Sequence, residues 1–226
     1  MYKTLKNNWA LFIGFAILAT AHGFQGNLLG VRAVIEEFNY LAVGALFSGY
    51  FLGYFVGAFY CPKLINSVGH IRTFSAFASL ASLSALIHVT FVNPYVWIFG
   101  RFLTGFSMIA IFIVTESWLN DRATNRNRGQ ILSLYMIITY VAFATGNLLL
   151  NVSSPTKYEP FILISVLFSI ALIPILLAKK KPPKFKKTAS MSIKELYRIS
   201  PFGSFAMLCT GFIYSAVLTL ASVYAA

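Results

Sequence analysis

The stretch Tyr95–Leu119 reads YVWIFGRFLTGFSMIAIFIVTESWL and decides the fold class. A helix rises about 1.5 Å per residue and the hydrocarbon layer is about 30 Å thick, so a run of this length is long enough to cross a membrane. Its centre, Ile109–Val114, is apolar at consecutive positions. This pattern lacks the alternation of a membrane-barrel strand. The stretch therefore predicts a transmembrane helix.

Six further apolar runs of about 20 residues flank this one on both sides and predict an all-α, polytopic membrane protein. The composition agrees, because 58% of the 226 residues are hydrophobic and only 11% are charged. Soluble domains carry about 25% charged residues. The six runs are Trp9–Gly30, Leu41–Cys61, Thr73–Val92, Ile131–Leu150, Phe161–Ala178 and Phe202–Ala226.

The basic residues predict the orientation of these helices. Eighteen bases against six acids give a net charge of +12, and the bases lie in short clusters between the apolar runs. Basic clusters of this kind mark cytoplasmic loops rather than a nucleic-acid surface. An amino terminus in the cytoplasm places the turns 63–72 and 122–128 and the segment 179–198 inside. Only Arg32 and Lys157 then fall in outer turns.

The chain divides into three predicted parts. Residues 1–178 form a six-helix bundle, residues 179–200 form a basic cytoplasmic linker, and residues 201–226 form a seventh helix. Within the linker, Ser192 and Glu195 have the spacing of a capping box, which predicts a short surface helix. No polar tail follows the seventh run up to Ala226, so we expect a truncated chain.

Prolines and capping residues predict where three of the helices begin. Asn93 followed by Pro94 predicts the start of the fourth, Pro160 the start of the sixth, and Ser200-Pro201 the start of the seventh. Proline is tolerated in the first turn of a helix because its missing N–H is unpaired there in any case.

Several short stretches resemble the major facilitator superfamily, and in particular the YcaD-like branch of bacterial permeases. Residues 62–72 have the spacing of the superfamily's turn between its second and third helices, although Pro62, Asn66 and Ser67 replace the usual glycine, acid and base. Residues 101–105 have the Arg-x-x-x-Gly spacing of its second motif. The branch is indicated by Leu29-Gly30-Val31-Arg32-Ala33, Gly69-His70-Ile71-Arg72, Glu116-Ser117-Trp118-Leu119-Asn120 and Arg128-Gly129-Gln130.

This resemblance covers the whole chain, which would be a little over half of a twelve-helix family member. It implies secondary transport by alternating access across the bacterial inner membrane, with a central cavity between two six-helix halves. It names neither the solute nor the coupling ion. The partner bundle would be a missing C-terminal half or a second copy of this chain.

Few polar residues within the apolar runs are candidates for a substrate cavity. Arg101 is expected to face the bundle, because a charge in hydrocarbon is costly; the alternative is snorkelling to the outer headgroups or bonding to carbonyl oxygens of a neighbouring helix. The resemblance to the second motif implies that it holds an anionic group of the solute or modulates a protonatable partner. His22 and Gln25 share a face of the first helix, where they either line the cavity or bond to neighbouring helices. His22 is the proton carrier expected in this half if protons drive transport. Thr139 and Asn147 are the further candidates; Thr139 has the alternative of bonding back to its own helix.

A second set of residues is expected to form a cytoplasmic gate. Glu116 lies near the inner end of the fourth run, and Asn66 cannot supply the charge usual in the turn before Gly69. We therefore expect Glu116 to pair with Arg72 or Arg128 and latch the gate. The alternative is a carboxylate at headgroup level that is hydrated and close to arginines.

Glycines predict close helix packing. Gly49, Gly53 and Gly57 recur every four residues on the second helix, and Gly105 ends the second motif on the fourth. Glycines at this spacing let another helix approach closely.

His88, near the outer end of the third run, is expected at the membrane interface.

The sequence lacks the motifs of the common membrane-associated enzymes. It contains no GxxxxGK[ST], HExxH or GxSxG stretch, and Cys61 and Cys209 have no CxxC companion. We therefore expect no cofactor, no metal and no enzymatic activity. The leading hypothesis is a permease for a small polar or anionic solute; the alternatives are a membrane scaffold or receptor, a homodimeric half-transporter and, less favoured, a lipid-modifying enzyme.

Overall fold

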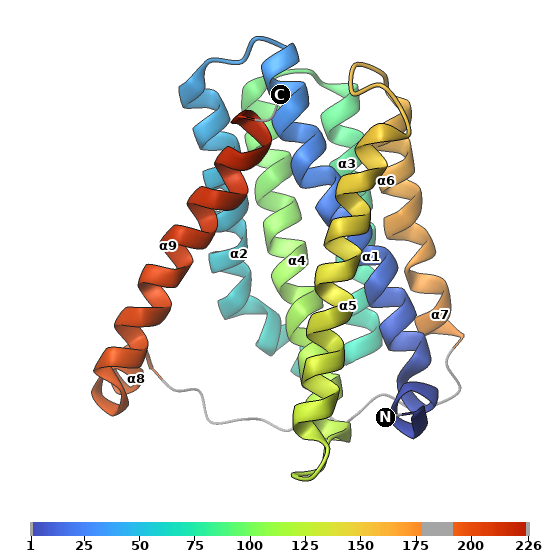
Figure 1. Cartoon of the computed structure of the whole chain (residues 1–226), viewed down its shortest axis with the longest axis vertical. Coiled ribbons are helices and arrows are strands. Elements are labelled where there is room, and N and C mark those ends of the chain that lie inside the picture. The colour runs from blue at the N-terminus through green and yellow to red at the C-terminus, as the bar shows by residue number, and fades with distance from the viewer. Residues whose placement is uncertain (1, 178–191, 225–226) are drawn as a thin grey trace. The chain divides into compact units, whose positions relative to one another are not determined.

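The computed structural model describes residues 2–177 and 192–224, which belong to two separate compact units. The predicted basic linker falls largely on residues 178–191, outside the described part of the chain. The first unit is a bundle of long helices and the second holds two helices (Figure 1). Among the described residues every regular element is helical, which confirms the all-α prediction.

The bundle runs up and down, with consecutive helices joined by short connections (Figure 1). Six of its helical segments are long and apolar enough to cross a membrane, the last of them made of two consecutive helices. The helices are α1 (Tyr2–Ile35), α2 (Tyr40–Val68), α3 (His70–Thr90), α4 (Pro94–Arg122), α5 (Arg128–Leu148), α6 (Glu159–Ile170) and α7 (Leu172–Leu176), with a 3-10 turn, η1 (Leu149–Asn151), after α5.

The predicted helix starts are confirmed. The side chain of Asn93 accepts hydrogen bonds from the backbone N–H groups of Tyr95 and Val96, with Pro94 in the first turn of α4. These bonds satisfy two of the donors that a helix start leaves unpaired. Pro160 lies in the first turn of α6.

The sixth span is broken at Ala171, which the sequence reading missed. Pro174 lies within α7 and has no backbone N–H to bond the carbonyl of Ile170, four residues earlier. The helix therefore ends at Ile170 and restarts at Leu172. α1 packs closely against this break. A methyl added to Gly14 would lie only 2.7 Å from the carbonyl oxygen of Ala171.

The connection between α2 and α3 is shorter than predicted. The second span was expected to end at Cys61, but α2 continues through Pro62 to Val68. Gly69 alone turns the chain into α3, with φ of 85°. That is left-handed backbone, which glycine adopts without the steric cost of a side chain.

Two helix pairs pack with almost no space between their backbones. In the α2–α4 pair, a methyl added to Gly49 would lie 2.9 Å from the carbonyl oxygen of Ile98. A methyl added to Gly53 or Gly105 would overlap the backbone carbonyl of Phe102 or Tyr50, respectively. Small residues allow this approach, and it brings the polar groups carried by the two helices within reach of each other.

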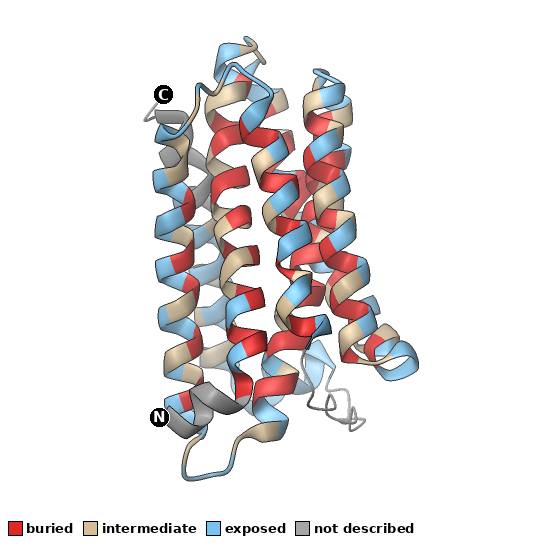
Figure 2. Cartoon of the chain, turned by 90° about the vertical axis from the view of Figure 1, so that its right-hand side faces the viewer, coloured by how far each residue is buried: buried red, intermediate tan, exposed pale blue. Residues whose placement is uncertain are grey.

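The α1–α5 pair is built in the same way. A methyl added to Gly23 would lie 3.0 Å from the backbone of Phe143, and a methyl added to Gly146 would overlap the backbone carbonyl of Thr20. α4 and α5, in contrast, touch at few points. The bundle core lies along the inward faces of these helices, where buried residues recur turn after turn (Figure 2).

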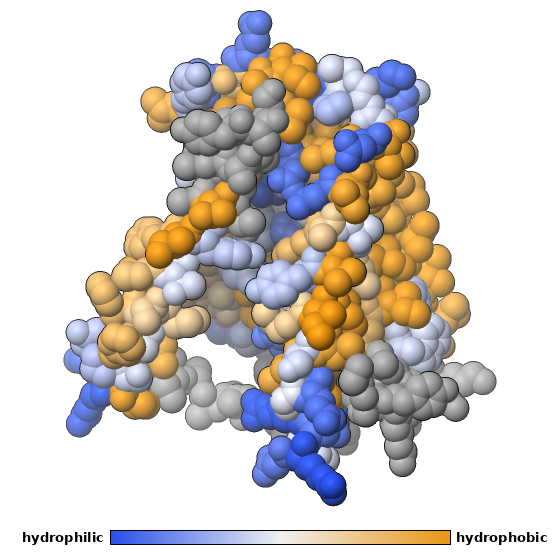
Figure 3. All heavy atoms as spheres, in the orientation of Figure 1, coloured by the Kyte–Doolittle hydropathy of each residue, from blue (hydrophilic) through white to orange (hydrophobic). Residues whose placement is uncertain are grey.

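The outer faces of the bundle suit a lipid environment. Hydrophobic residues cover the flanks of α5, α6 and α7, whereas the α4–α5 turn is hydrophilic (Figure 3). Large apolar side chains such as Phe55, Phe59 and Ile137 are more than half exposed. A soluble monomer rarely exposes apolar surface of this extent, so these faces are those expected to contact acyl chains.

The second unit contains α8 (Ile193–Ile199) and α9 (Pro201–Tyr224). The predicted capping box is confirmed: Ser192 Oγ accepts from the N–H of Glu195, and the Glu195 carboxylate accepts from the N–H of Ser192 at 2.8 Å. These bonds hold the pKa of Glu195 below its usual value because they favour the ionised form. α9 begins at Pro201, where the seventh helix was predicted to start.

Candidate substrate site

Arg101 is the buried cation of the bundle, and the α2–α4 seam positions it. Its side chain is 3% exposed. The guanidinium carbon lies 4.5 Å from the ring centre of Tyr50 and 5.7 Å from that of Phe47, both on α2. Nε and Nη1 are buried without a hydrogen-bond partner. The guanidinium therefore packs on aromatic rings instead of snorkelling toward the membrane surface.

His22 on α1 joins the same cluster through Tyr50. Its Nε2 is hydrogen-bonded to the Tyr50 hydroxyl at 3.1 Å, and the two rings stack with centroids 5.4 Å apart. Phe143 on α5 also contacts the imidazole, edge to face. Nδ1 of His22 is buried without a partner. We call Arg101, His22, Tyr50 and Phe47 the Arg101 cluster.

The other residues predicted for the cavity divide into two groups. Gln25 is fully buried, and both polar atoms of its amide lack a partner. Asn147 is engaged with Asn27 across the α1–α5 seam. Thr139 donates to the carbonyl of Tyr135 on its own helix at 2.8 Å. Gln25 and the Arg101 cluster thus carry unsatisfied polar atoms, whereas Thr139 and Asn147 do not depend on a ligand.

The Arg101 cluster has the chemistry of an anion site. A guanidinium offers five N–H donors and no acceptor, and it suits carboxylate and phosphate groups. Among the described residues no acidic side chain forms an ion pair with Arg101. Unpaired polar atoms in a buried site are costly. An anionic ligand would remove that cost here.

At the other end of α4, Glu116 makes a different contact from the one expected. The Tyr135 hydroxyl on α5 donates to its carboxylate at 3.2 Å, and among the described residues it forms no ion pair with Arg72 or Arg128. The reason is geometric: Glu116 faces α5, while Arg72 and Arg128 project outward and are exposed. Asn66 is exposed as well.

Two of the signature stretches meet in space beside this gate region. His70 Nε2, in the first turn of α3, is hydrogen-bonded to Ser117 Oγ on α4 at 2.8 Å. The ring of His70 also contacts Trp118 edge to face. The stretches 69–72 and 116–120, which lie far apart in the sequence, therefore form a single α3–α4 contact.

His88, which was predicted at the membrane interface, is enclosed by the bundle near the end of α3. The side chain is fully buried. Its Nδ1 is 2.5 Å from the carbonyl of Ser84, its ring contacts Trp97, and Gly100 leaves the space it occupies. The helix backbone and an aromatic neighbour thus enclose the polar ring.

Sequence reasoning missed two tyrosines that organise these contacts. Tyr50 links His22 with Arg101, and Tyr135 holds Glu116. A buried tyrosine needs a partner for its hydroxyl, so a tyrosine within an apolar run is the signal that the sequence offers. For metals, the described residues contain no group of three or more His, Cys, Asp or Glu that could bind one.

Comparisons with known proteins agree with this architecture. The YcaD transporter of Escherichia fergusonii, an uncharacterised protein of the MFS type, is 25% identical over 216 residues, covering 95% of this chain and 56% of that protein. An MFS-type transporter of Yersinia enterocolitica is 32% identical over 136 residues, covering 60% of this chain and 36% of that protein. The chain thus spans between about a third and just over half of the length of these relatives.

A solved structure shares the fold. A crystal structure of a mutant of the nucleoside transporter NupG superposes with a TM-score of 0.70 at 14% identity, covering 98% of this chain and 57% of that one. The resemblance to the YcaD-like branch is confirmed by the relatives. The profile of the Major Facilitator Superfamily matches residues 11–226, and the chain therefore belongs to that family.

Proposed function

We propose that this protein takes part in secondary transport of a small anionic solute by alternating access. The observation that carries the proposal is Arg101, a buried cation with two unpartnered nitrogens and no acidic neighbour among the described residues. The superfamily and the relatives named as transporters support the general activity. The preference for an anion comes from the chemistry of Arg101.

The Arg101 cluster supplies a preorganised binding group. The rings of Tyr50 and Phe47 hold the guanidinium in place, which lowers the entropy lost when a ligand binds. His22 Nδ1 and the amide of Gln25 add polar atoms that a polyfunctional solute can bond. If protons are the coupling ion, His22 is the group in this half that would exchange them.

Alternating access needs a second bundle and a gate. We place the solute between this bundle and a partner bundle, which is either a C-terminal half or a second copy of the chain. The contact of Glu116 with Tyr135 belongs to one state of the cytoplasmic gate. In the other state Glu116 exchanges Tyr135 for Arg72 or Arg128, next to Asn66 and Gly69. We assign the chain to a bacterial inner membrane with its amino terminus in the cytoplasm, as the basic clusters indicate.

Binding of simple acids tests the proposal. Thermal unfolding of the purified chain is measured with lactate, succinate or benzoate, and with the uncharged amide of each acid. A ligand that binds the folded state stabilises it by about 2.7 kcal/mol at a hundred times its Kd. We expect an acid to stabilise the protein, its amide to have no effect, and Arg101→Met to abolish the response.

Arg126→Met is the matched control, because Arg126 is an exposed cation in the α4–α5 turn. The control should respond like the wild type. In proteoliposomes, uptake of the acid that binds should be lost in Arg101→Ala while the amount of inserted protein is unchanged. Equal stabilisation by acid and amide, or unchanged uptake in Arg101→Ala, would contradict an anion site at Arg101.

A further inference from the structure

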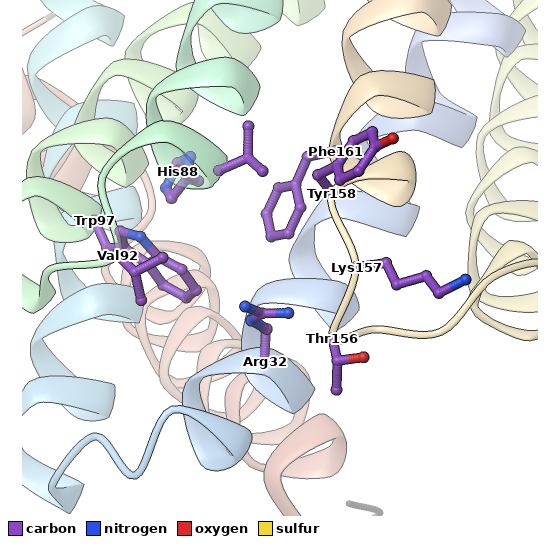
Figure 4. Close-up of a pocket in the computed structure, with 9 residues that line it drawn as sticks. Arg32, His88, Val92, Trp97, Thr156, Lys157, Tyr158 and Phe161 are labelled. Carbon is purple, nitrogen blue, oxygen red and sulfur yellow. The ribbon is translucent and has the colours of Figure 1, made fainter.

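A separate pocket of about 220 Å³ opens at the end of the bundle where α1 ends and α4 and α6 begin (Figure 4). Arg32 from the last turn of α1 contributes to it, as do Trp97 of α4 and Phe161 of α6. None of the residues of the Arg101 cluster lines it. We call it the Arg32 pocket, and it is a site that the transport proposal does not use.

The apolar wall of the Arg32 pocket is rigid. Trp97 is fully buried, and its indole N–H donates to the carbonyl of Phe91 at 2.9 Å. Phe38 and Phe161 pack against the same indole ring. Phe161 is 2% exposed. The pocket thus offers a preformed aromatic surface to the apolar part of a ligand.

The polar side of the pocket is the Arg32 guanidinium. Its Nη1 donates to the carbonyl of Pro155 at 2.9 Å, and its Nη2 pairs with Glu36 at 2.5 Å. These two contacts fix the orientation of the guanidinium, which Figure 4 shows between Val92 and Thr156 and below Phe161. Its Nε is buried and has no hydrogen-bond partner. The wall therefore contains a charged donor that is held in place and unsatisfied.

Lys157 adds a second positive charge at the same pocket. Its stem belongs to the lining, and in Figure 4 its ammonium is turned away from Arg32. The lysine side chain is long and flexible, so the ammonium can approach a bound anion with little change in the backbone. Glu36 neutralises the charge of Arg32, and Lys157 leaves the pocket with a net positive charge.

We propose that the Arg32 pocket binds an amphiphilic anion, with a carboxylate or phosphate head at Arg32 and an apolar body against the aromatic wall that Trp97 and Phe161 form. The volume corresponds to about seven water molecules at about 30 Å³ each, which suits an acidic head with one ring or a short chain. The anion comes either from the aqueous phase or from a lipid headgroup of the adjacent leaflet, and the two sources share this chemistry.

Trp97 reports directly on the pocket. Trp9→Phe and Trp118→Phe together leave it as the sole tryptophan of the chain. The protein is placed in phosphatidylcholine nanodiscs and titrated with cyclohexanecarboxylate, with the neutral cyclohexanecarboxamide as the matched probe. We expect a saturable change in Trp97 emission with the acid only. A change on replacing part of the phosphatidylcholine by phosphatidylglycerol, in the absence of the acid, assigns the lipid source instead.

Variants at Arg32 decide whether that change comes from the pocket. Arg32→Gln should weaken the response about tenfold or more, because a charge-assisted hydrogen bond is lost. Arg32→Lys keeps the charge without the Nε donor and should be intermediate. Lys157→Gln, which leaves the Arg32 contacts intact, should weaken the response two- to threefold, by an order-of-magnitude argument from one screened charge. Arg126→Gln is the control and should bind like the wild type.

Two results would overturn the proposal. The first is an emission change that the acid and the amide produce equally. The second is a response, to the acid or to phosphatidylglycerol, that Arg32→Gln and Lys157→Gln both leave unchanged. Arg101→Met is expected to leave this titration unchanged, so its outcome does not depend on the transport proposal.

Discussion

The two ends of α4 handle charge in opposite ways. Near Arg101 the backbone of α4 packs directly against that of α2 at Gly53 and Gly105, and the guanidinium is buried against aromatic rings. At Glu116 the helix touches α5 at few points, and the exposed carboxylate is held by a single hydrogen bond from Tyr135. The same helix therefore carries one group with a fixed position and one group that is free to change partners.

In the proposed function this difference would separate binding from gating. A binding group gains from rigidity, because a ligand then meets an organised site. A gate needs contacts of similar free energy in two states, and one hydrogen bond at an exposed site meets that requirement. We expect changes at the Arg101 end to alter stability and affinity, and changes at the Glu116 end to alter the balance between conformations.

Breaking the α2–α4 seam should have the largest effect. In Gly53→Ala the new methyl would overlap the backbone carbonyl of Phe102, so the two helices must separate. We expect a loss of about 3 kcal/mol in the free energy of unfolding, the upper range for overpacking. Thermal unfolding in detergent measures it. Gly44→Ala on the same helix is the control, since a methyl there would meet no packed neighbour within 4 Å.

Replacing the buried cation should have the next largest effect, with the opposite sign. Arg101→Met removes a charge that no carboxylate neutralises within the described residues and keeps most of the side-chain volume. Desolvation of a buried charge costs several kcal/mol, and the contact with Tyr50 offsets part of that cost. We expect a gain of about 2 kcal/mol in unfolding free energy, measured by the same thermal unfolding. A loss of stability would mean that Arg101 has a structural role.

The two ends of α4 also differ in how well the sequence predicts them. Burial of Arg101 follows from the cost of a charge in hydrocarbon, so one residue in an apolar run was enough. The partner of Glu116 depends on which face of α4 meets α5, and neither spacing nor composition determines that. For the same reason Tyr50 and Tyr135 were missed, although the helices that carry them were predicted.

The bundle itself was predictable because length and hydropathy specify membrane helices almost independently of their neighbours. The break at Ala171 was not predicted, although Pro174 in the sequence indicates it. The burial of His88 has a tertiary origin: the space at Gly100 and the carbonyl of Ser84 make a buried imidazole acceptable. Such contacts become visible only when the helices are placed side by side.

Removing the bond at the Glu116 end should have a smaller effect. Tyr135→Phe deletes the hydroxyl that donates to Glu116 and leaves the ring contact with Phe15. We expect a loss of about 1 kcal/mol in unfolding free energy, the usual net value of one hydrogen bond. In double electron–electron resonance, spin labels on the exposed positions 120 and 133 should show a shifted distance distribution. A distribution identical to that of the wild type would argue against a gate at this contact.

The smallest effect is expected at Thr139, one turn along α5 from Tyr135. Thr139 is 7% exposed, and its hydroxyl is bonded to the carbonyl of Tyr135 on its own helix. Such back-bonds contribute little to helix stability, so Thr139→Val should change the unfolding free energy by no more than about 0.5 kcal/mol. Affinity for an acid that binds at Arg101 should also stay the same, as measured by the ligand-induced shift in unfolding. A large loss of affinity would place Thr139 in the binding site and remove the separation between a binding end and a gating end of α4.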